Sequence, residues 1–439
     1  LPEGWAWSRI KNIASIGTGA TPLKSNTEYY VGGKISWITS AATCDNIIKS
    51  ATDYITELAV QETNCQIYPV GTLVVAMYGE GKTRGQISEL GIAACTNQAC
   101  AAIQVWGGNA GVSQLVKMFF SYNYENIRMK AKGGQQPNLN QSIIAETLIP
   151  IPPENEIMRL LDFSHICLNG IQVITENKER IFQLSNQART KILDLAIRGK
   201  LVPQDPKDEP ASVLLERIRA EKEELIRQGK IKRDKKESII FRGEDNSYYE
   251  KVGGEVICID NMIPFEIPES WAWCRGYSCF EDMASIKPHG DFFDYIDIDA
   301  IDNRSHCIKE AKHLPVAKAP SRASRALQSG SVLFSLVRPY LENIALVDEE
   351  HSHCIASTGF YVCNSNGVFL PEFLFFLMIS RYVVSGLNQY MKGDNSPSIS
   401  KDNIEDWLYP IPPLEEQEAI CFKLKEAFSA IGHIEKSLS

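Results

Sequence analysis

The sequence predicts an α/β fold in which two α/β domains, in a pseudo-twofold arrangement, are joined by a long antiparallel pair of helices in a coiled coil. Two observations predict this class. The chain repeats a series of landmarks at a nearly constant offset, and each copy is followed by a helical stretch with apolar residues at heptad spacing. Because each copy is about 150 residues long, it is expected to form a core of its own.

The landmarks of the two copies follow in the same order. Each copy opens on Trp-x-Trp, contains a glycine turn before a β-rich apolar run, and closes on Pro-Ile-Pro-Pro. The matching segments are 2–9 with 268–275, 71–76 with 330–335, 133–140 with 393–400, and 150–154 with 410–414. We therefore predict one domain over residues 1–153 and a second over 264–413. The tryptophans are expected to pack in the domain cores.

A long helix is predicted over residues 154–200, because Pro152 and Pro153 suit a helix entrance and the next 45 residues contain no proline. Apolar residues at spacings of seven form two stripes along this helix. The first stripe consists of Leu160, Cys167, Ile174, Ile181, Ala188 and Leu195. The second is only partly apolar and includes Ile157, Ile171 and Ile192. Such a helix would be ~67 Å long. Residues 414–439 repeat both stripes, so the two helices are expected to bury them against each other and to hold the domains at a set interval.

Residues 201–263 are predicted to be a linker with a second helix, at 211–236. This helix ends in a basic cluster, Lys230, Lys232, Arg233, Lys235 and Lys236. The cluster is either solvated or a contact for phosphate or for a partner protein, and the residues leave both interpretations open.

Composition excludes several protein classes. With 44% hydrophobic and 23% charged residues and no apolar run near the ~20 residues of a membrane span, the chain is expected to be globular, cytoplasmic and without a membrane partner. The 12 cysteines form no C-x2-C pair, so we expect buried thiols rather than disulfides or a metal site. The net charge of −9 means that an anionic partner would have to be bound by local basic patches.

No catalytic centre is evident. Residues 76–83 match a relaxed P-loop, but the segment after Lys82 is too short between its glycines to form the phosphate-binding helix, so a glycine-supported basic turn is the preferred interpretation. The cluster of His306, His351, His353 and neighbouring cysteines fits no common zinc spacing. A stand-alone P-loop NTPase and a duplicated scaffold module that binds no DNA remain as alternatives.

Basic and amide side chains are concentrated in segments without acidic residues. Residues 311–341 contain no Asp or Glu, and residues 126–145 contain none in the first copy. Lys and Arg neutralise phosphates, while Arg, Gln and Asn form paired hydrogen bonds with base edges. The DNA-contact candidates are Lys82, Arg84, Gln135, Gln136 and Asn138 in the first domain, and Arg322, Arg325 and Arg338 in the second.

The chain resembles the specificity (S) subunits of type I restriction-modification systems over nearly its whole length. The resemblance rests on the paired Trp-x-Trp openings, the Pro-Ile-Pro-Pro closures, and the segments 319–322, 330–345 and 199–206. The last of these, GKLVPQDP, is highly specific. A Tyr-Gly…Gly-Lys turn, as at 78–82, is common in the recognition domains of this family and binds no nucleotide.

The resemblance implies a non-catalytic subunit with two target-recognition domains, each of which reads one half of a split double-stranded DNA target. The implied partners are two adenine methyltransferase (modification) subunits and a motor/endonuclease subunit. S-adenosylmethionine, ATP and Mg would belong to those partners, and this chain would hold no cofactor. The second helix aligns only with residues up to 179 of the first helix, and no second copy of 199–206 is present. Either the chain is truncated or one partner docks on a smaller surface.

Overall fold

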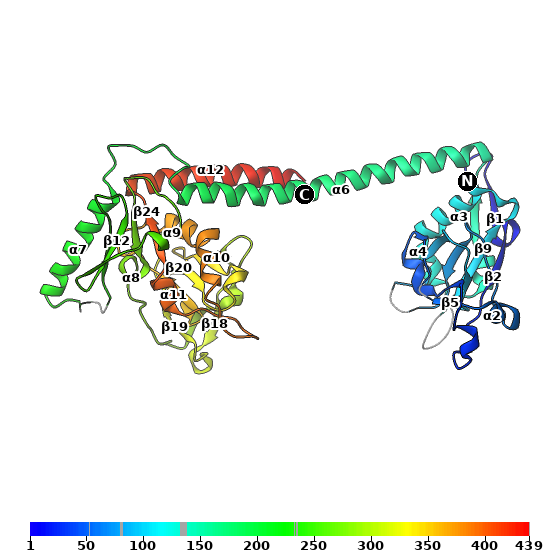
Figure 1. The fold of residues 1–439 in the computed structure, drawn as a ribbon, viewed down its shortest axis with the longest axis horizontal. Helices are drawn as coiled ribbons and strands as arrows, with labels where there is room; N and C mark the ends of the chain where they lie inside the picture. The colour runs from blue at the N-terminus through cyan, green and yellow to red at the C-terminus, as the bar shows by residue number, and fades with distance from the viewer. Residues whose placement is uncertain (52, 80–81, 132–137, 232, 234–235, 439) are drawn as a thin grey trace. The chain divides into compact units, whose positions relative to one another are not determined.

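The computed structural model describes residues 1–51, 53–79, 82–131, 138–231, 233 and 236–438. These residues divide into two units, Leu1–Thr175 and Glu176–Ser439. Helix α6, Glu154–Ile197, is one continuous helix that begins in the first unit and ends in the second (Figure 1). Each unit is described by itself below.

The first unit is built on a mixed five-stranded sheet in the order β2-β9-β6-β7-β4. The central strand β6 alternates its side chains between two cores: Leu73 and Val75 point into one, and Val74 into the other. A three-stranded sheet, β5-β3-β8, and the pair β1-β10 complete the unit. The strands are β1 Ala6–Arg9, β2 Ala14–Thr18, β3 Ile35–Ile38, β4 Ile47–Ile48, β5 Asp53–Ile55, β6 Leu73–Ala76, β7 Ile87–Leu90, β8 Cys95–Thr96, β9 Cys100–Val105 and β10 Leu148–Ile151.

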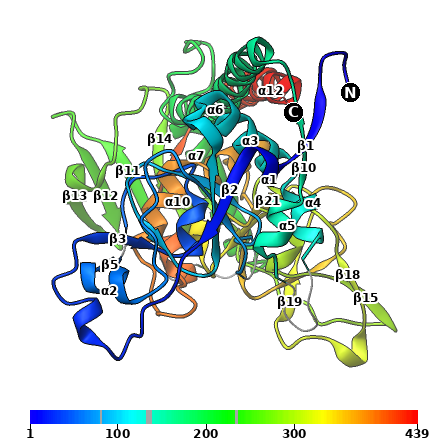
Figure 2. The same cartoon turned by 90° about the vertical axis from the view of Figure 1, so that its right-hand side faces the viewer.

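Short helices cover one face of the five-stranded sheet. Figure 2 shows α1, α3, α4 and α5 on one side of β2 and the β3–β5 region with α2 on the other. Helix α3 begins where the Asn109 side chain accepts a hydrogen bond from the Val112 amide, and it buries Val116 and Phe120. The helices are α1 Ile10–Ile13, α2 Glu57–Glu62, α3 Ala110–Tyr122, α4 Tyr124–Met129 and α5 Gln141–Ala145.

The second unit shares part of this topology. A three-stranded sheet, β21-β20-β23, lies beside a four-stranded sheet, β18-β15-β22-β19, and β14 pairs with β24 as β1 pairs with β10. The strands are β14 Ala272–Arg275, β15 Phe292–Ile296, β16 Ile301–Asp302, β17 Cys307–Ile308, β18 Lys312–Pro315, β19 Ala323–Ala326, β20 Val332–Ser335, β21 Ile344–Leu346, β22 Ile355–Ser357, β23 Phe360–Cys363 and β24 Leu408–Ile411. The helices are α8 Gly276–Cys279, α9 Pro371–Met378, α10 Arg381–Asn388, α11 Lys401–Glu405 and α12 Leu414–Leu438.

Equivalent residues of the two copies form the same hydrogen bonds. The indole N–H of Trp5 donates to Glu156 at 3.1 Å, and that of Trp271 donates to Glu416 at 2.7 Å. The backbone shows the same agreement, because the Leu139 amide donates to the Met77 carbonyl as the Ile399 amide does to that of Leu336. The segments that repeat in the sequence therefore make equivalent contacts in two copies of one fold.

Residues 201–263 form more than the linker and helix predicted from the sequence. Helix α7 covers Ala211–Arg227 and ends before Gly229, which has a φ of +70°, whereas the sequence predicted a helix to Lys236. An antiparallel sheet follows, with strands β11 Ser238–Arg242, β12 Tyr248–Val252 and β13 Glu255–Cys258. Gly253 and Gly254, both with positive φ, form the turn between β12 and β13, which is a standard hairpin signal.

This additional sheet segment changes the surroundings of the tryptophans. Trp273 is 1% exposed and packs edge-on against Phe265 and Tyr382. Its counterpart Trp7 is 59% exposed, so the prediction that all four tryptophans are core residues is wrong for Trp7. Trp273 is covered by Phe265, from the segment before β14, and by Tyr382 of α10.

The predicted apolar stripes of α6 are buried only where α12 packs against them. Leu193 and Ile197 of α6 share a core with Ile420 and Leu424 of α12, and Arg189 donates two hydrogen bonds to Glu435, at 2.8 and 3.0 Å. These contacts make α12 antiparallel to the second half of α6, and Figure 1 shows the two helices side by side. Farther toward the start of α6, Cys167 is exposed and Ile171 and Ile174 are 60% and 69% exposed, so the prediction of a fully buried seam is wrong there.

Candidate nucleic-acid interface

In the first unit, the turn between β6 and β7 presents the predicted lysine. Two glycines in left-handed conformations, Gly79 with a φ of +143° and Gly85 with a φ of +90°, shape this turn. A Cβ on Gly79 would lie 2.8 Å from the side chain of Thr83, so a larger residue would force the turn to shift. Lys82 is exposed at this turn and Arg84 is half-buried.

The segment that carries the predicted amides runs beside this turn. Since the Leu139 amide donates to the Met77 carbonyl at 3.0 Å, half-buried Asn138 is held next to the end of β6. Gln135 and Gln136 lie outside the described residues. The structure thus brings Lys82, Arg84 and Asn138 to one end of the first unit.

Helix α4 braces the turn through a tyrosine and an arginine that the sequence analysis did not select. The Tyr124 hydroxyl donates to the Lys82 carbonyl, and the Arg128 guanidinium donates to the Tyr124 oxygen at 2.9 Å and lies 5.3 Å from the ring centre. The spacing of four residues between Tyr124 and Arg128 was the available signal, since residues so spaced meet on one face of a helix.

A hollow of about 330 Å³ opens beside this turn. Its lining includes hydroxyl, amide, carboxylate and ammonium groups, from Thr43, Asp45, Asn46, Lys82, Gln86, Ser121 and Tyr124. Amides and hydroxyls pair with base edges and lysine neutralises phosphate, so this end of the unit carries both kinds of group used in DNA recognition.

In the second unit, Arg338 lies at the corresponding turn, after β20. It adopts a left-handed conformation, with φ +48° and ψ +55°, although it is not glycine. Its guanidinium donates to the Asn395 carbonyl at 3.0 Å and its amide donates to the Pro397 carbonyl at 2.7 Å. The β20–β21 turn and the segment before α11 therefore meet here, as the equivalent segments do in the first unit.

The other two predicted arginines belong to a different sheet of the second unit. Arg322 is exposed just before β19, and Arg325 is half-buried within β19, beside a break in register with β22. Among the described residues, no acceptor lies within hydrogen-bonding distance of the buried Nε of Arg325. The structure places Arg322 and Arg325 together but gives no contact between them and Arg338.

Carboxylates neutralise part of the predicted basic patch. Lys312 pairs with Asp297, and this hydrogen bond raises the pKa of the Lys312 ammonium. Asp294 accepts hydrogen bonds from His313 at 2.8 Å and from His353 at 3.0 Å, and these two contacts lower the pKa of the Asp294 carboxyl. Fewer basic side chains in this region are therefore available to bind an anion than the number of basic residues in the sequence suggests.

The basic cluster after α7 is partly paired as well. Arg233 forms an ion pair with Glu223 at 2.6 Å, and Lys236 forms one with Asp406 at 2.9 Å. Lys232 and Lys235 lie outside the described residues. Exposed pairs of this kind contribute little stability, so the pairing is compatible with a solvated surface.

The structure does not provide the surroundings that a P-loop or a zinc site needs. After Lys82 the chain forms a turn and then strand β7, with no helix to hold phosphates. Within the described ranges, no three His, Cys, Asp or Glu side chains are grouped to hold a metal ion, and no helix is long and apolar enough to cross a membrane. All 12 cysteines are free thiols, and eight of them are buried.

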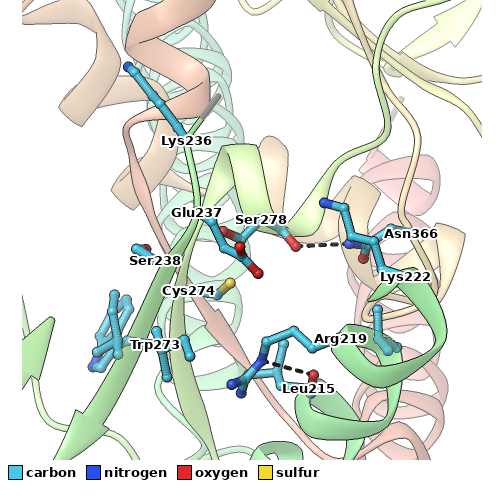
Figure 3. Close-up of a pocket in the computed structure, with 13 residues that line it drawn as sticks. Leu215, Arg219, Lys222, Lys236, Glu237, Ser238, Trp273, Cys274, Ser278 and Asn366 are labelled. Atoms are coloured by element: carbon cyan, nitrogen blue, oxygen red, sulfur yellow. Dashed lines mark hydrogen bonds between the residues drawn. The ribbon is translucent and has the colours of Figure 1, made fainter. Parts of the chain in front are cut away.

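Another hollow lies between α7, β11 and α8 (Figure 3). Arg219 and Lys222 of α7 line one side, and Ser278 and Asn366 line another; Asn366 donates to the Ser278 carbonyl at 2.8 Å. The enclosed space of about 40 Å³ holds a water molecule and not a nucleotide. Such a water would satisfy the buried Ser278 hydroxyl and the Asn366 carbonyl oxygen, which have no partner within the described part of the chain.

Comparisons with known proteins agree on one family. A family model described as the type I restriction modification DNA specificity domain matches residues 2–181. The chain is 26% identical over 349 residues to the type I restriction enzyme EcoAI specificity subunit of Escherichia coli, an alignment that covers 73% of this chain and 55% of that protein. It is 29% identical over 246 residues to the EcoEI specificity subunit of the same species, which covers 53% of this chain and 37% of that protein.

A solved structure shows the same fold over the whole chain. It comes from work on complex assembly and conformational transition of the type I restriction-modification system, and it covers 100% of this chain and 93% of its own chain with a TM-score of 0.57 at 14% identity. The alignments to the two E. coli proteins span only 55% and 37% of those relatives, so this chain covers less than two thirds of their length.

Proposed function

We propose, from the premise that the chain belongs to the specificity subunits of type I restriction-modification systems, that it selects a split target on double-stranded DNA. Each copy of the repeated fold would read one half of the target. The chain itself would catalyse no reaction; its task would be to direct the chemistry of partner subunits to the selected site.

One observation carries this proposal: the two copies share their fold and several of its hydrogen bonds, but they have different side chains in the turns that follow corresponding strands. The frame is shared down to single hydrogen bonds, such as those from Trp5 and Trp271 to equivalent glutamates. At the third residue after the central strand, however, the first copy has Gly79 and the second has Arg338. A conserved frame with different side chains at its exposed turns is suited to reading two different sequences.

The first domain offers a lysine for phosphate and amides for base edges. Exposed Lys82 would neutralise a phosphate, while Asn138 and the predicted Gln135 and Gln136 would read bases. Half-buried Arg84, at the same turn, would also contact the DNA. In the second domain the corresponding contacts would come from Arg322, Arg325 and Arg338.

The proposed partners are two adenine methyltransferase subunits and a motor/endonuclease subunit in the cytoplasm. S-adenosylmethionine, ATP and Mg would be bound by these partners. The two domains would be related by a pseudo-twofold axis, with α6 and α12 as the antiparallel pair between them. The proposal that α6 and α12 form an antiparallel pair is supported by the contacts of Arg189, Leu193 and Ile197, which join the second half of α6 to α12 within the second unit.

A change in helix length tests the proposal that the helices set the distance between half-targets. Removing one heptad from both α6 and α12 shortens each helix by about 10 Å while preserving the stripe. Mapping of methylated adenines made by the assembled complex should then show the same two half-targets separated by a shorter unread spacer. An unchanged spacer would refute the proposal, and the control is a variant in which seven surface residues of α6 are substituted without deletion.

A further inference from the structure

The hollow beside the turn between β6 and β7 has one acidic side chain among basic neighbours. Of the residues that line it, only Asp45 and Lys82 are charged. Arg84 belongs to the same turn as Lys82. Arg128 lies next to the hollow, because it donates to the oxygen of Tyr124, a lining residue, at 2.9 Å. Since these three cations suit a surface that meets DNA phosphates, a carboxylate among them opposes that attraction and indicates another role.

The fold itself does not use the Asp45 carboxylate. Asp45 is exposed, and within the described part of the chain no hydrogen bond or ion pair engages its side chain, not even one with Lys82. Both carboxylate oxygens are therefore available to accept hydrogen bonds from a ligand. An ionised carboxylate has no hydrogen to donate, so the ligand has to supply the donor.

Hydrogen bonds to strand β7 fix the backbone that carries Asp45. The hydroxyl of buried Ser88 donates to the Asp45 carbonyl at 2.5 Å, and the Glu89 amide donates to the Asn46 carbonyl at 3.4 Å. Strand β4 then pairs with β7, with Ile47 opposite Glu89. The Asp45 side chain therefore projects from a fixed point, which lowers the ordering cost of a contact and makes its geometry selective.

The segment around Asp45 differs between the two copies. Strand β15 corresponds to β3, because each pairs parallel with one strand and antiparallel with another. Each is followed by a 3-10 helix, Ser40–Cys44 in the first copy and Ile298–Ala300 in the second. In the first copy Asp45 and Asn46 separate this helix from the next strand, whereas in the second copy strand β16 begins at once, at Ile301. Residues 45 and 46 also lie outside every segment on which the family resemblance rests, as expected of residues that set a variable target.

We propose that Asp45 is a specificity-determining residue of the first domain and that its carboxylate accepts a hydrogen bond from the exocyclic amino group of a base in the major groove. Cytosine N4 and adenine N6 supply this donor. Thymine O4 and guanine O6 are acceptors on the same edge, so a carboxylate selects against them. The inference rests on the function proposed above, because it assumes that the first domain reads DNA.

The test uses the complex of the full chain with its partner subunits and the target mapped from its adenine methylation. Affinities are measured for duplexes in which one base at a time lacks its amino group: 2-pyrimidinone replaces each cytosine, and purine replaces each adenine that is not methylated. The complex should lose about tenfold in affinity at the position that Asp45 reads. The analogue that produces this loss shows whether the donor is cytosine N4 or adenine N6.

Two variants of Asp45 connect this loss to the carboxylate. Asp45→Ala should weaken binding to the unmodified target about tenfold and should abolish the response to amino-group removal at that one position. It should not weaken binding to unrelated duplex DNA, because it removes a negative charge. Asp45→Asn has a donor as well as an acceptor, so it should tolerate guanine or thymine at this position better than the original chain does.

A matched control separates recognition from net charge. Asp162→Ala removes an exposed carboxylate of α6 that does not line the hollow, and it should leave both the affinity and the response to amino-group removal unchanged. All three variants should have the unfolding midpoint of the original chain, because the altered side chains are exposed.

The outcomes distinguish this inference from the proposed function. A complex that shows no sequence preference on duplex DNA would overturn the proposed function. A complex that prefers its target, but whose Asp45→Ala variant keeps the full response to amino-group removal at every position, would overturn the role of Asp45 alone. The same conclusion would follow if Asp45→Ala weakened binding to target and unrelated DNA equally.

Discussion

Replacing Glu250 by glutamine is expected to destabilise the second unit by about 3 to 5 kcal/mol, because it breaks a buried ion pair and leaves a cation without its counter-charge. Arg275 donates to both oxygens of Glu250, at 3.0 and 2.7 Å, and the side chains are only 11% and 4% exposed. Glutamine fits the same space and still accepts one hydrogen bond, so the loss reports the charge and not the packing.

The first unit contains a matched control. Arg9 is the repeat counterpart of Arg275, and each donates to the backbone carbonyl at the equivalent position, Glu146 or Asp406. Arg9 also pairs with the Glu146 carboxylate at 2.9 Å, but there the two side chains are 44% and 43% exposed. Glu146→Gln should therefore cost far less stability than Glu250→Gln, because exposed ion pairs contribute little.

The pH dependence of this stabilisation has a defined sign. Burial alone would raise the pKa of Glu250, but the hydrogen bonds and charge of Arg275 outweigh it and hold that pKa below its ordinary value. A carboxyl with a lowered pKa in the folded state stabilises the fold above its unfolded-state pKa of about 4.3 and loses this contribution as the pH falls through the folded-state value. The difference between the original chain and Glu250→Gln should accordingly shrink under acid conditions.

The assay is urea unfolding of the full chain near neutral pH, with hydrogen exchange of β11, β12 and β13 to locate the change. Glu250→Gln should lower the unfolding midpoint and expose the amides of these strands, whereas Glu146→Gln should do neither. If both substitutions have the same small effect, the Arg275 ion pair is not a buried structural contact and the reasoning is refuted.

Three further predictions concern the second helix and the two turns. Burial raises the pKa of the Glu416 carboxyl, so the original chain should gain stability relative to Glu416→Gln as the pH falls from neutral toward the unfolded-state pKa of about 4.3; a constant difference in unfolding free energy would contradict this. Glu342→Gly should raise the free energy of unfolding by up to about 1 kcal/mol, because glycine accepts a φ of +56°, and a loss of stability in thermal unfolding would show that the Glu342 side chain has a stabilising role. Lys82→Ala should reduce the slope of log affinity for DNA against log salt concentration by about one, whereas an unchanged slope would mean that Lys82 contacts no phosphate.

The features that could be predicted from the sequence are those that recur within it. The offset of the Trp-x-Trp motifs predicts two copies of one fold, and Trp5 and Trp271 indeed make the same bond to a glutamate at the start of a long helix. The apolar stripes predict the contact of α6 with α12 at Leu193 and Ile197. Repetition is informative because a segment that recurs in the sequence is expected to form the same local structure in both copies.

The features that could not be predicted depend on what covers a residue in space. Trp7 and Trp273 have the same local sequence, yet only Trp273 is buried, because Phe265 and Tyr382 pack against it. The exposed part of α6 has the same heptad spacing as the buried part, and periodicity alone does not say whether a partner is present. The sequence analysis did not predict the sheet of β11, β12 and β13, although Gly253 and Gly254 signal its hairpin, because the residues after the predicted helix were interpreted as linker.

The sequence predicted which residues belong to the candidate site, but it did not predict how they are arranged in space. The acid-free segment 311–341 led to Arg338, and the glycine-supported basic turn led to Lys82 and Arg84; the structure places all three at turns that follow the central strands. Neither the left-handed conformation of Arg338 nor the support of Lys82 by Tyr124 follows from composition, because both depend on contacts between segments distant in sequence.

The most direct test of the claim that one chain reads two separate half-targets is to map methylated adenines in cells with and without this chain. With the chain and its partner subunits present, the methylated sites should share two short sequences separated by a constant number of unread bases, and these sites should lose methylation when the chain is removed. A single uninterrupted target, or a methylation pattern that does not depend on the chain, would contradict the claim.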